Sequence, residues 1–147
     1  MNFTGTVVID APLQKVWDNL TDPNVVSQCA PGLQSMEVIV PDKQFKVIAS
    51  IGFGAVKITF DVDVEWLEKE APSYAKVKAH GKAPGSGVDV SSDMRLASLS
   101  ESSSELKWTA DVSVVGTIAS MASRMMEGLT RQMSNKFFDC IKGKIEA

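Results

Sequence analysis

The clearest hydrophobic pattern of the chain is a long helical stripe near its end. Between Ile118 and Ile145, apolar residues recur at steps of three and four, which places their side chains on one face of a helix. The stripe comprises Ile118, Met121, Ala122, Met125, Met126, Leu129, Met133, Phe137, Phe138, Ile141 and Ile145. At 1.5 Å per residue this predicted helix is roughly 40 Å long. Its methionines favour an adaptable apolar surface, because Met is flexible and polarizable.

Most of the remaining chain alternates between apolar and polar residues, which predicts β-strands with one wet face. The cleanest strand covers residues 56–66, where Phe60 and its alternate neighbours face one side while Asp61, Asp63 and Glu65 face the other. Further strands are predicted at residues 3–9, 36–40, 45–51, 74–83, 88–99 and 106–114. Two short helices follow the first strand, one behind Asp10 as N-cap and one from Pro23 to about Gln28 behind Asp22.

The predicted order is one strand, two short helices, six strands and one long helix, all in a single domain over residues 1–147. The fold class is therefore α+β, with a seven-stranded antiparallel sheet curved around the C-terminal helix. A curved sheet and a straight helix leave a gap between them. Small residues on the apolar sheet face widen that gap, namely Ala49, Ala75, Ala79 and Ala110. We expect an internal apolar pocket there.

Several short strings occur in an order that resembles a known family. They are Ala11-Pro12, Val16-Trp17, Asp22-Pro23, Cys29-Ala30-Pro31-Gly32-Leu33, Gly81, Pro84-Gly85-Ser86-Gly87, Val115-Gly116 and Phe137-Phe138. The element order is similar to that of the START-like, helix-grip (SRPBCC) superfamily of hydrophobic-ligand binders. Within it, these strings resemble the family of the carbon monoxide dehydrogenase G subunit over essentially the whole chain.

The resemblance implies a function. Members of that family look like accessory proteins of molybdenum-containing carbon monoxide dehydrogenases and their relatives. They are thought to hold a lipid-like ligand such as an isoprenoid quinone and to help the enzyme engage the membrane. Many carry a further C-terminal linker with a membrane-seeking tail, whereas this sequence stops at Ala147. We therefore expect a hydrophobic small molecule and carbon monoxide dehydrogenase subunits as partners, with peripheral rather than anchored membrane contact.

Composition and charge narrow the function classes. The net charge is −3 and no extended basic cluster occurs, which argues against nucleic acid as a partner. The first residues lack the features of a signal peptide, and no apolar run is long enough to span a membrane. Cys29 and Cys140 are separated by no metal-binding spacing, so we expect free thiols. Together these features favour the cytoplasm, including the inner face of the cell membrane.

The candidate ligand-binding residues come from the helix stripe and the apolar sheet face. They are Val47, Ile58, Phe60, Val77, Trp108, Met121, Met125, Leu129 and Met133. We expect part of the methionine stripe to pack as core and the middle of the helix to face the pocket. Arg124 and Arg131 flank the stripe and could meet a polar ligand head, although exposed helix cations are the simpler interpretation. The loop at residues 84–87 could close over the pocket mouth.

Catalytic and metal-binding interpretations find little support. His80, the sole histidine, shares strand parity with Lys76 and Lys78, which we interpret as facing solvent. Asp61, Asp63 and Glu65 share a wet face for the same reason. We therefore expect no catalytic residue, metal or cofactor. Two alternatives stay open: a small cyclase or hydrolase that uses the same pocket, and a module that docks on a large enzyme through its helix or loops.

Overall fold

The computed structural model describes residues 1–146, and its elements follow the predicted order. They are β1 (Asn2–Ile9), α1 (Leu13–Leu20), α2 (Pro23–Cys29), β2 (Leu33–Val40), β3 (Gln44–Phe53), β4 (Val56–Glu70), β5 (Tyr74–Ala83), β6 (Ser86–Ser100), β7 (Ser103–Gly116) and α3 (Ala119–Ile145). The seven strands, the two short helices and the long final helix are thus confirmed. Strands β4, β6 and β7 extend beyond their apolar segments into polar hairpin ends.

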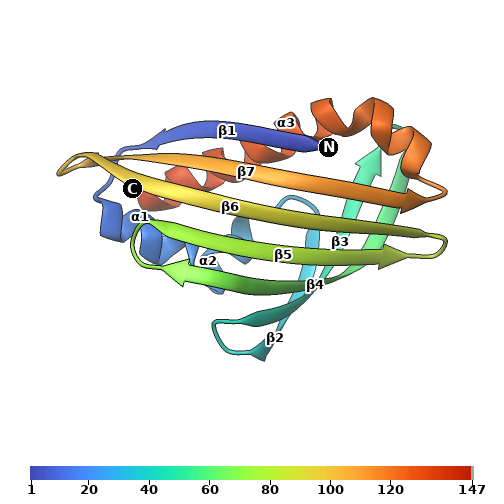
Figure 1. The fold of residues 1–147 in the computed structure, drawn as a ribbon, viewed down its shortest axis with the longest axis horizontal. Helices are drawn as coiled ribbons and strands as arrows, with labels where there is room; N and C mark the ends of the chain where they lie inside the picture. The colour runs from blue at the N-terminus through green and yellow to red at the C-terminus, as the bar shows by residue number, and fades with distance from the viewer. Residues whose placement is uncertain (147) are drawn as a thin grey trace.

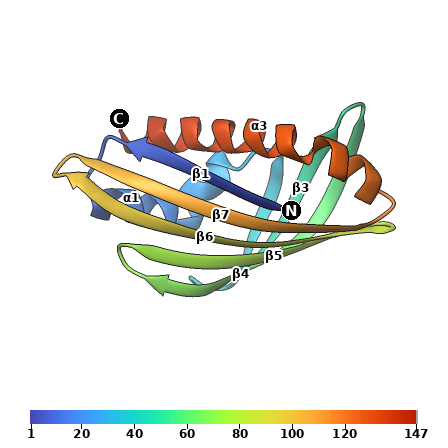
Figure 2. The same cartoon turned by 45° about the horizontal axis from the view of Figure 1, so that its top comes forward.

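All strand pairings are antiparallel in one seven-stranded sheet with the order β1-β7-β6-β5-β4-β3-β2. The pairing of β1 with β7 is the one between strands distant in the chain, so β1 and β2 form the two edges. Figure 1 shows the strands side by side, and Figure 2 shows α3 lying along the face toward which the sheet curves. Helices α1 and α2 cover one end of the same face.

Two separate clusters of buried side chains fasten α3 to the sheet, one near each end of the helix. Near its start, Ile118, Ala122 and Met126 pack with Phe53, Phe60 and Val112. Near its end, Ile141 and Ile145 pack with Ile9, Val16, Trp17, Leu20, Leu96 and Leu106. Each cluster removes apolar surface from water. The middle of α3 lies between the two clusters.

A tight turn at Pro84-Gly85 holds the beginning of α3 in place. Gly85 has φ +73° and Gly116 has φ +94°, both in the left-handed region that glycine adopts readily. A side chain at Gly116 would also overlap the carbonyl of Gly85. Thr117 N–H donates to the Gly85 carbonyl at 3.0 Å. The segment we expected to close over the pocket mouth is therefore a hydrogen-bonded hairpin turn attached to the start of α3.

The two predicted helix caps have different outcomes. The Asp22 carboxylate accepts a hydrogen bond from Asn24 N–H at 2.9 Å, as expected for the cap of α2. The prediction of Asp10 as cap of α1 is wrong, because that helix begins at Leu13 and its N-cap is Pro12. Asp10 instead donates its backbone N–H to the Glu146 carboxylate at 2.9 Å, which ties the end of β1 to the end of the chain's last helix.

The expectation of free thiols is also wrong. Cys29 and Cys140 form a disulfide with 5.4 Å between their Cα atoms. The partners are 111 residues apart in sequence, and the folding of α2 onto α3 brings them together. The bridge thus joins the end of α2 to the C-terminal half of α3.

Within residues 1–146, no helix combines the length and the apolar character that crossing a lipid bilayer requires.

Candidate ligand-binding site

A large cavity lies between the curved face of the sheet and the middle of α3. Its volume is about 660 Å³. The walls come from strands β3 to β7, from α2 and the Ala30-Pro31 segment that follows it, and from Met126 to Phe138 of α3. Nearly all of these side chains are apolar. A cavity of this size and character is typical of small-molecule sites in proteins.

Small residues keep the cavity open. Ala49, Ala75, Ala79 and Ala110 all line it, as the sequence predicted, together with Gly81. These residues lie on the same face of neighbouring strands, as the pairing of Ala79 with Val90 and Val64 shows. Because the sheet curves away from a straight helix, side chains of this length do not reach α3. The space left between them is the cavity.

Five of the nine residues predicted from the sequence line this cavity. They are Phe60, Val77, Trp108, Leu129 and Met133. Their strand parity and helix spacing placed them on the two facing surfaces. Contact with a ligand stays a prediction for each of them.

The other four predicted residues lie outside the cavity wall. Ile58, Met121 and Met125 pack against the core cluster at the start of α3. The β3–β4 hairpin turns over this part of the helix, where Gly54 faces Met125. Val47 pairs with Met36 and Val62 near the β2 edge of the sheet. The helix middle faces the cavity as expected, but core packing takes up its first turns.

Several lining residues were missed among the sequence predictions. Trp66, Met94, Phe137 and Phe138 all contribute to the wall. The alternation of β4 and the stripe of α3 could have identified Trp66 and the two phenylalanines. Val26, Ala30 and Pro31 could not be found this way, because their place depends on how α2 folds back onto α3.

Few polar groups face the cavity. Ser92, Asp93, Thr130 and Ser134 line it, as does the amphipathic Trp108. Ser92 donates to the Thr109 carbonyl at 2.7 Å, and Ser134 donates to the Arg131 carbonyl at 3.1 Å. The Asp93 carboxylate accepts from the Thr109 hydroxyl at 2.7 Å. For residues 1–146, the Trp108 indole N–H and the Thr130 hydroxyl have no such protein partner.

A second hollow, a groove of about 770 Å³, runs between edge strand β1 and α3. One wall is β1 from Met1 to Val7. The other is a polar strip of α3 that includes Ser123, Glu127, Arg131, Asn135 and Lys142. Five residues line both this groove and the apolar cavity: Trp108, Met126, Thr130, Ser134 and Phe138. The two spaces therefore adjoin along these side chains.

Trp108 occupies its place at this boundary because β1 has a glycine opposite it. Gly5 pairs with Trp108 in the β1–β7 register. A Cβ at Gly5 would overlap the indole Nε1 and lie 2.8 Å from Cζ2. The missing side chain therefore lets the indole lie across β1, with its N–H edge toward that strand.

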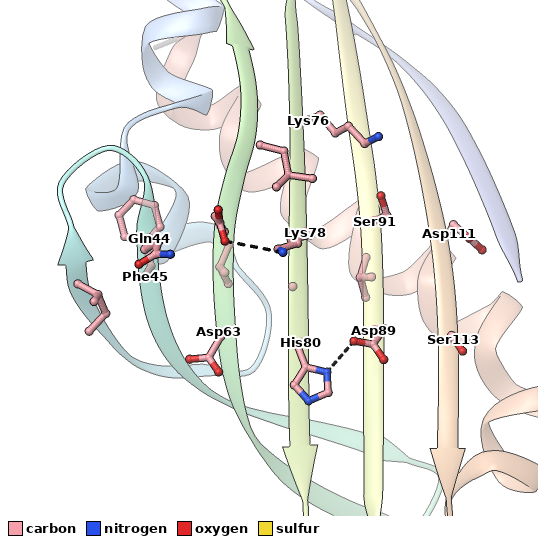
Figure 3. A pocket seen from close by; sticks show the side chains of 16 residues that line it. Gln44, Phe45, Asp63, Lys76, Lys78, His80, Asp89, Ser91, Asp111 and Ser113 are labelled. Carbon is pink, nitrogen blue, oxygen red and sulfur yellow. Dashed lines mark hydrogen bonds and ion pairs between the residues drawn. The ribbon is translucent and has the colours of Figure 1, made fainter.

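The opposite face of the sheet carries the histidine and most strand charges. Figure 3 shows His80 beside Asp89 on this face, with Asp63 nearby and α3 behind the strands. His80 Nδ1 lies 2.6 Å from the Asp89 carboxylate, and both side chains are more than half exposed. The predicted solvent-facing orientation of His80 is thus correct. Across residues 1–146, no three His, Cys, Asp or Glu side chains gather so as to hold a metal ion.

Comparison with known proteins supports both the fold and its use. A sequence model of the carbon monoxide dehydrogenase G subunit family (CoxG) matches residues 5–146. No curated protein matches the chain.

Solved structures match over almost the full length. A conserved protein from Geobacillus kaustophilus is 26% identical with a TM-score of 0.92, covering 99% of this chain and 95% of that one. The Zhui aromatase/cyclase from Streptomyces sp. R1128 is 18% identical with a TM-score of 0.76, covering 99% and 93%. A START superfamily protein from Mycobacterium smegmatis is 13% identical with a TM-score of 0.70, covering 99% and 97%. The fold is therefore the START-like helix-grip fold.

Proposed function

The chain belongs to the CoxG family of carbon monoxide dehydrogenase, and from this membership we propose that it binds a hydrophobic small molecule without chemically changing it. The ligand class is a lipid or an isoprenoid quinone. The ligand occupies the cavity between the sheet and α3. The single observation that carries this proposal is a cavity of about 660 Å³ with an almost wholly apolar wall.

The driving force is the removal of apolar ligand surface from water. At roughly 25 cal/mol per Å², a ligand that buries about 300 Å² gains about 7 kcal/mol before the costs of immobilisation. The lining residues Met126 and Met133 adapt to ligand shape, because their side chains are flexible. Affinity thus comes from apolar contact, while selectivity depends on cavity shape and on the few polar groups of the wall.

We further propose that the protein serves as an accessory factor of a molybdenum carbon monoxide dehydrogenase-like enzyme, as the family description suggests. A lipid or quinone is stored in a membrane. The protein therefore works in the cytoplasm and contacts the inner face of the cell membrane transiently to exchange its ligand. Dehydrogenase subunits are its protein partners.

An enzyme that uses the same cavity is the alternative, because an aromatase/cyclase has the same fold. Catalysis of that kind requires an ionisable group beside the substrate. Of the described residues, Asp93 is the one ionisable residue that lines the cavity, and its carboxylate is bonded to Thr109 on the outer face. His80 also faces outward. These placements favour binding over catalysis. In a third candidate function, docking on an enzyme, the cavity has no role.

The ligand proposal is tested by native mass spectrometry of freshly purified protein, followed by uptake of an added isoprenoid quinone. We expect a bound lipid-like mass or stoichiometric uptake. The variant Ala79→Phe places a ring in the cavity and should reduce uptake at least about tenfold, since even modest overpacking carries an energetic penalty of about 1–3 kcal/mol. Ser91→Phe, which adds the same ring to the outer face of a neighbouring strand, is the matched control.

A ligand-free mass with no uptake by the unmodified protein would contradict the proposal. Equal uptake by both variants would show that any bound molecule lies outside the cavity. The partner proposal needs a separate pull-down with dehydrogenase subunits. Capture that is unchanged by Ala79→Phe would favour the docking function.

A further inference from the structure

The polar groups at the boundary between the apolar cavity and the β1–α3 groove indicate how a ligand is oriented. We propose that the ligand is an amphiphile with its apolar body in the cavity and a neutral, hydrogen-bond-accepting head beside Trp108 and Thr130. The head faces the groove between β1 and α3. This inference rests on the proposed function and adds to it the chemistry and position of the ligand head.

The first support is the distribution of unused hydrogen-bonding groups. Elsewhere in the wall, the side chains of Ser92, Asp93 and Ser134 are bonded to protein groups. The Trp108 N–H and the Thr130 hydroxyl are not, as far as residues 1–146 extend. Both line the cavity and the groove alike. An indole N–H is purely a donor, so its complement is an acceptor oxygen such as a ketone, ester or quinone carbonyl.

The second support is the charge of the groove. Its ionisable side chains are two acids and two bases: Glu127, Asp139, Arg131 and Lys142. Glu127 and Arg131 pair with each other at 3.3 Å. Because the charges balance, the groove supplies no net attraction for an anionic or cationic head. A half-buried head without charge avoids the desolvation penalty that a charged head would suffer.

The third support is the accessibility of this side of the molecule. β1 is an edge strand, so its outer backbone groups face the groove rather than another strand. Polar helix residues Ser123, Thr130 and Asn135 line the opposite wall. On the other side of the cavity, the end of α2 is joined to α3 by the disulfide. The polar end of an amphiphile therefore finds hydrated surroundings on the β1 side.

The test uses three probes with one body and different heads: hexylbenzene, 4-hexylacetophenone and 4-hexylbenzoate. Each competes with the neutral fluorescent probe N-phenyl-1-naphthylamine. For the unmodified protein we expect the ketone to bind at least about fivefold more tightly than the carboxylate. Trp108→Phe and Thr130→Val should each weaken ketone binding about fivefold, the value of one hydrogen bond, and change hexylbenzene binding less than about twofold.

Trp66→Phe is the matched control, because Trp66 lines the same cavity from β4, on the far side from β1. It should affect the ketone and the hydrocarbon equally. Thr130→Val preserves side-chain shape, so it keeps the test decisive even if Trp108→Phe disturbs packing.

The outcomes separate the two proposals. If no probe displaces the fluorophore, or the fluorophore itself does not bind, the proposed function fails and this inference fails with it. If the probes bind but Trp108→Phe and Thr130→Val weaken ketone and hydrocarbon alike, the head position is wrong while the binding function stands. Tighter binding of 4-hexylbenzoate than of the ketone would overturn the assignment of a neutral head.

Discussion

At the residue scale, the contact between Gly5 and Trp108 decides the shape of the site. Glycine in a strand is usually unfavourable, because it adds backbone entropy to the unfolded chain and packs no side chain. Here its lack of a Cβ gives the indole room across β1. One residue without a side chain thus positions the largest side chain of the cavity wall.

Gly5→Ala should destabilise the fold by about 1–3 kcal/mol, because the added methyl group overlaps the indole ring. Urea unfolding measures the loss. Gly52→Ala is the control, since a Cβ at Gly52 meets no atom within 4 Å, and its effect should stay within about 0.5 kcal/mol.

The same prediction can be checked through coupling between the two sites. In a Trp108→Leu background, Gly5→Ala should be markedly less destabilising, because the overlap is gone. An equal loss in both backgrounds would show that strain other than the indole contact is responsible.

The sequence predicted cavity residues well where one face of an element settled the question. Strand alternation placed Phe60, Val77 and Trp108 on the correct side, and the helix stripe supplied Leu129 and Met133. Position along the helix was not predictable in the same way. Met121 and Met125 satisfy the same spacing, yet the β3–β4 hairpin packs over them. That closure depends on how far the sheet curves, and no periodicity in the sequence records it.

At the element scale, α3 is held by contacts of different kinds on its different sides. Its ends pack in two core clusters, and its middle covers the cavity. Lys144 also donates to the Gln28 side chain at 2.7 Å, close to the disulfide. The sequence predicted the helix and its buried face. It could not predict the bridge, because cysteine positions 111 residues apart say nothing about spatial distance before the fold is known.

Removal of the disulfide should lower stability by about 2–5 kcal/mol, because the bridge restricts the unfolded chain over a long loop. For a domain of this size, that corresponds to a Tm lower by roughly 5–15 °C. The measurement is thermal unfolding of the Cys29→Ala/Cys140→Ser double variant beside the unmodified protein.

Reductant serves as the internal control. It should lower the Tm of the unmodified protein and leave that of the double variant unchanged. Two reactive thiols in the unmodified protein, denatured without reductant, would show that the bridge does not form in solution.

At the scale of the whole molecule, stability should be uneven across the sheet. β6 and β7 are long strands in the interior of the sheet, each paired on both sides. β2 is a short edge strand, paired only with β3, and its register shifts twice. Its residues Val38, Ile39 and Val40 are each at least 40% exposed.

Hydrogen–deuterium exchange should therefore be at least about tenfold faster for amides of β2 than for amides in the middle of β6. Exposed edge strands open with little loss of buried contact, whereas opening of β6 breaks the centre of the sheet. Equal protection of the two strands would indicate that another surface covers the β2 edge in solution.

The overall architecture was predictable from the sequence because most local patterns agree with the global fold. Alternation identified the strands, turn residues such as Pro84-Gly85 separated them, and one long amphipathic stripe left a single way to cover the sheet. The groove beside β1 was not predictable. It depends on the edge position of β1 and on the tilt of α3 across it, which follow from the assembled molecule rather than from any segment.

The disulfide also restricts the direction in which α3 can move. Cys140 and the groove residue Arg131 are nine residues apart, or about two and a half helical turns, so they lie on opposite sides of the helix. A rod fixed along one long side lifts farthest along its free side. Any widening that admits a bulky chain molecule is thus greatest above β1, and such a molecule passes sideways between strand and helix instead of threading in from an end.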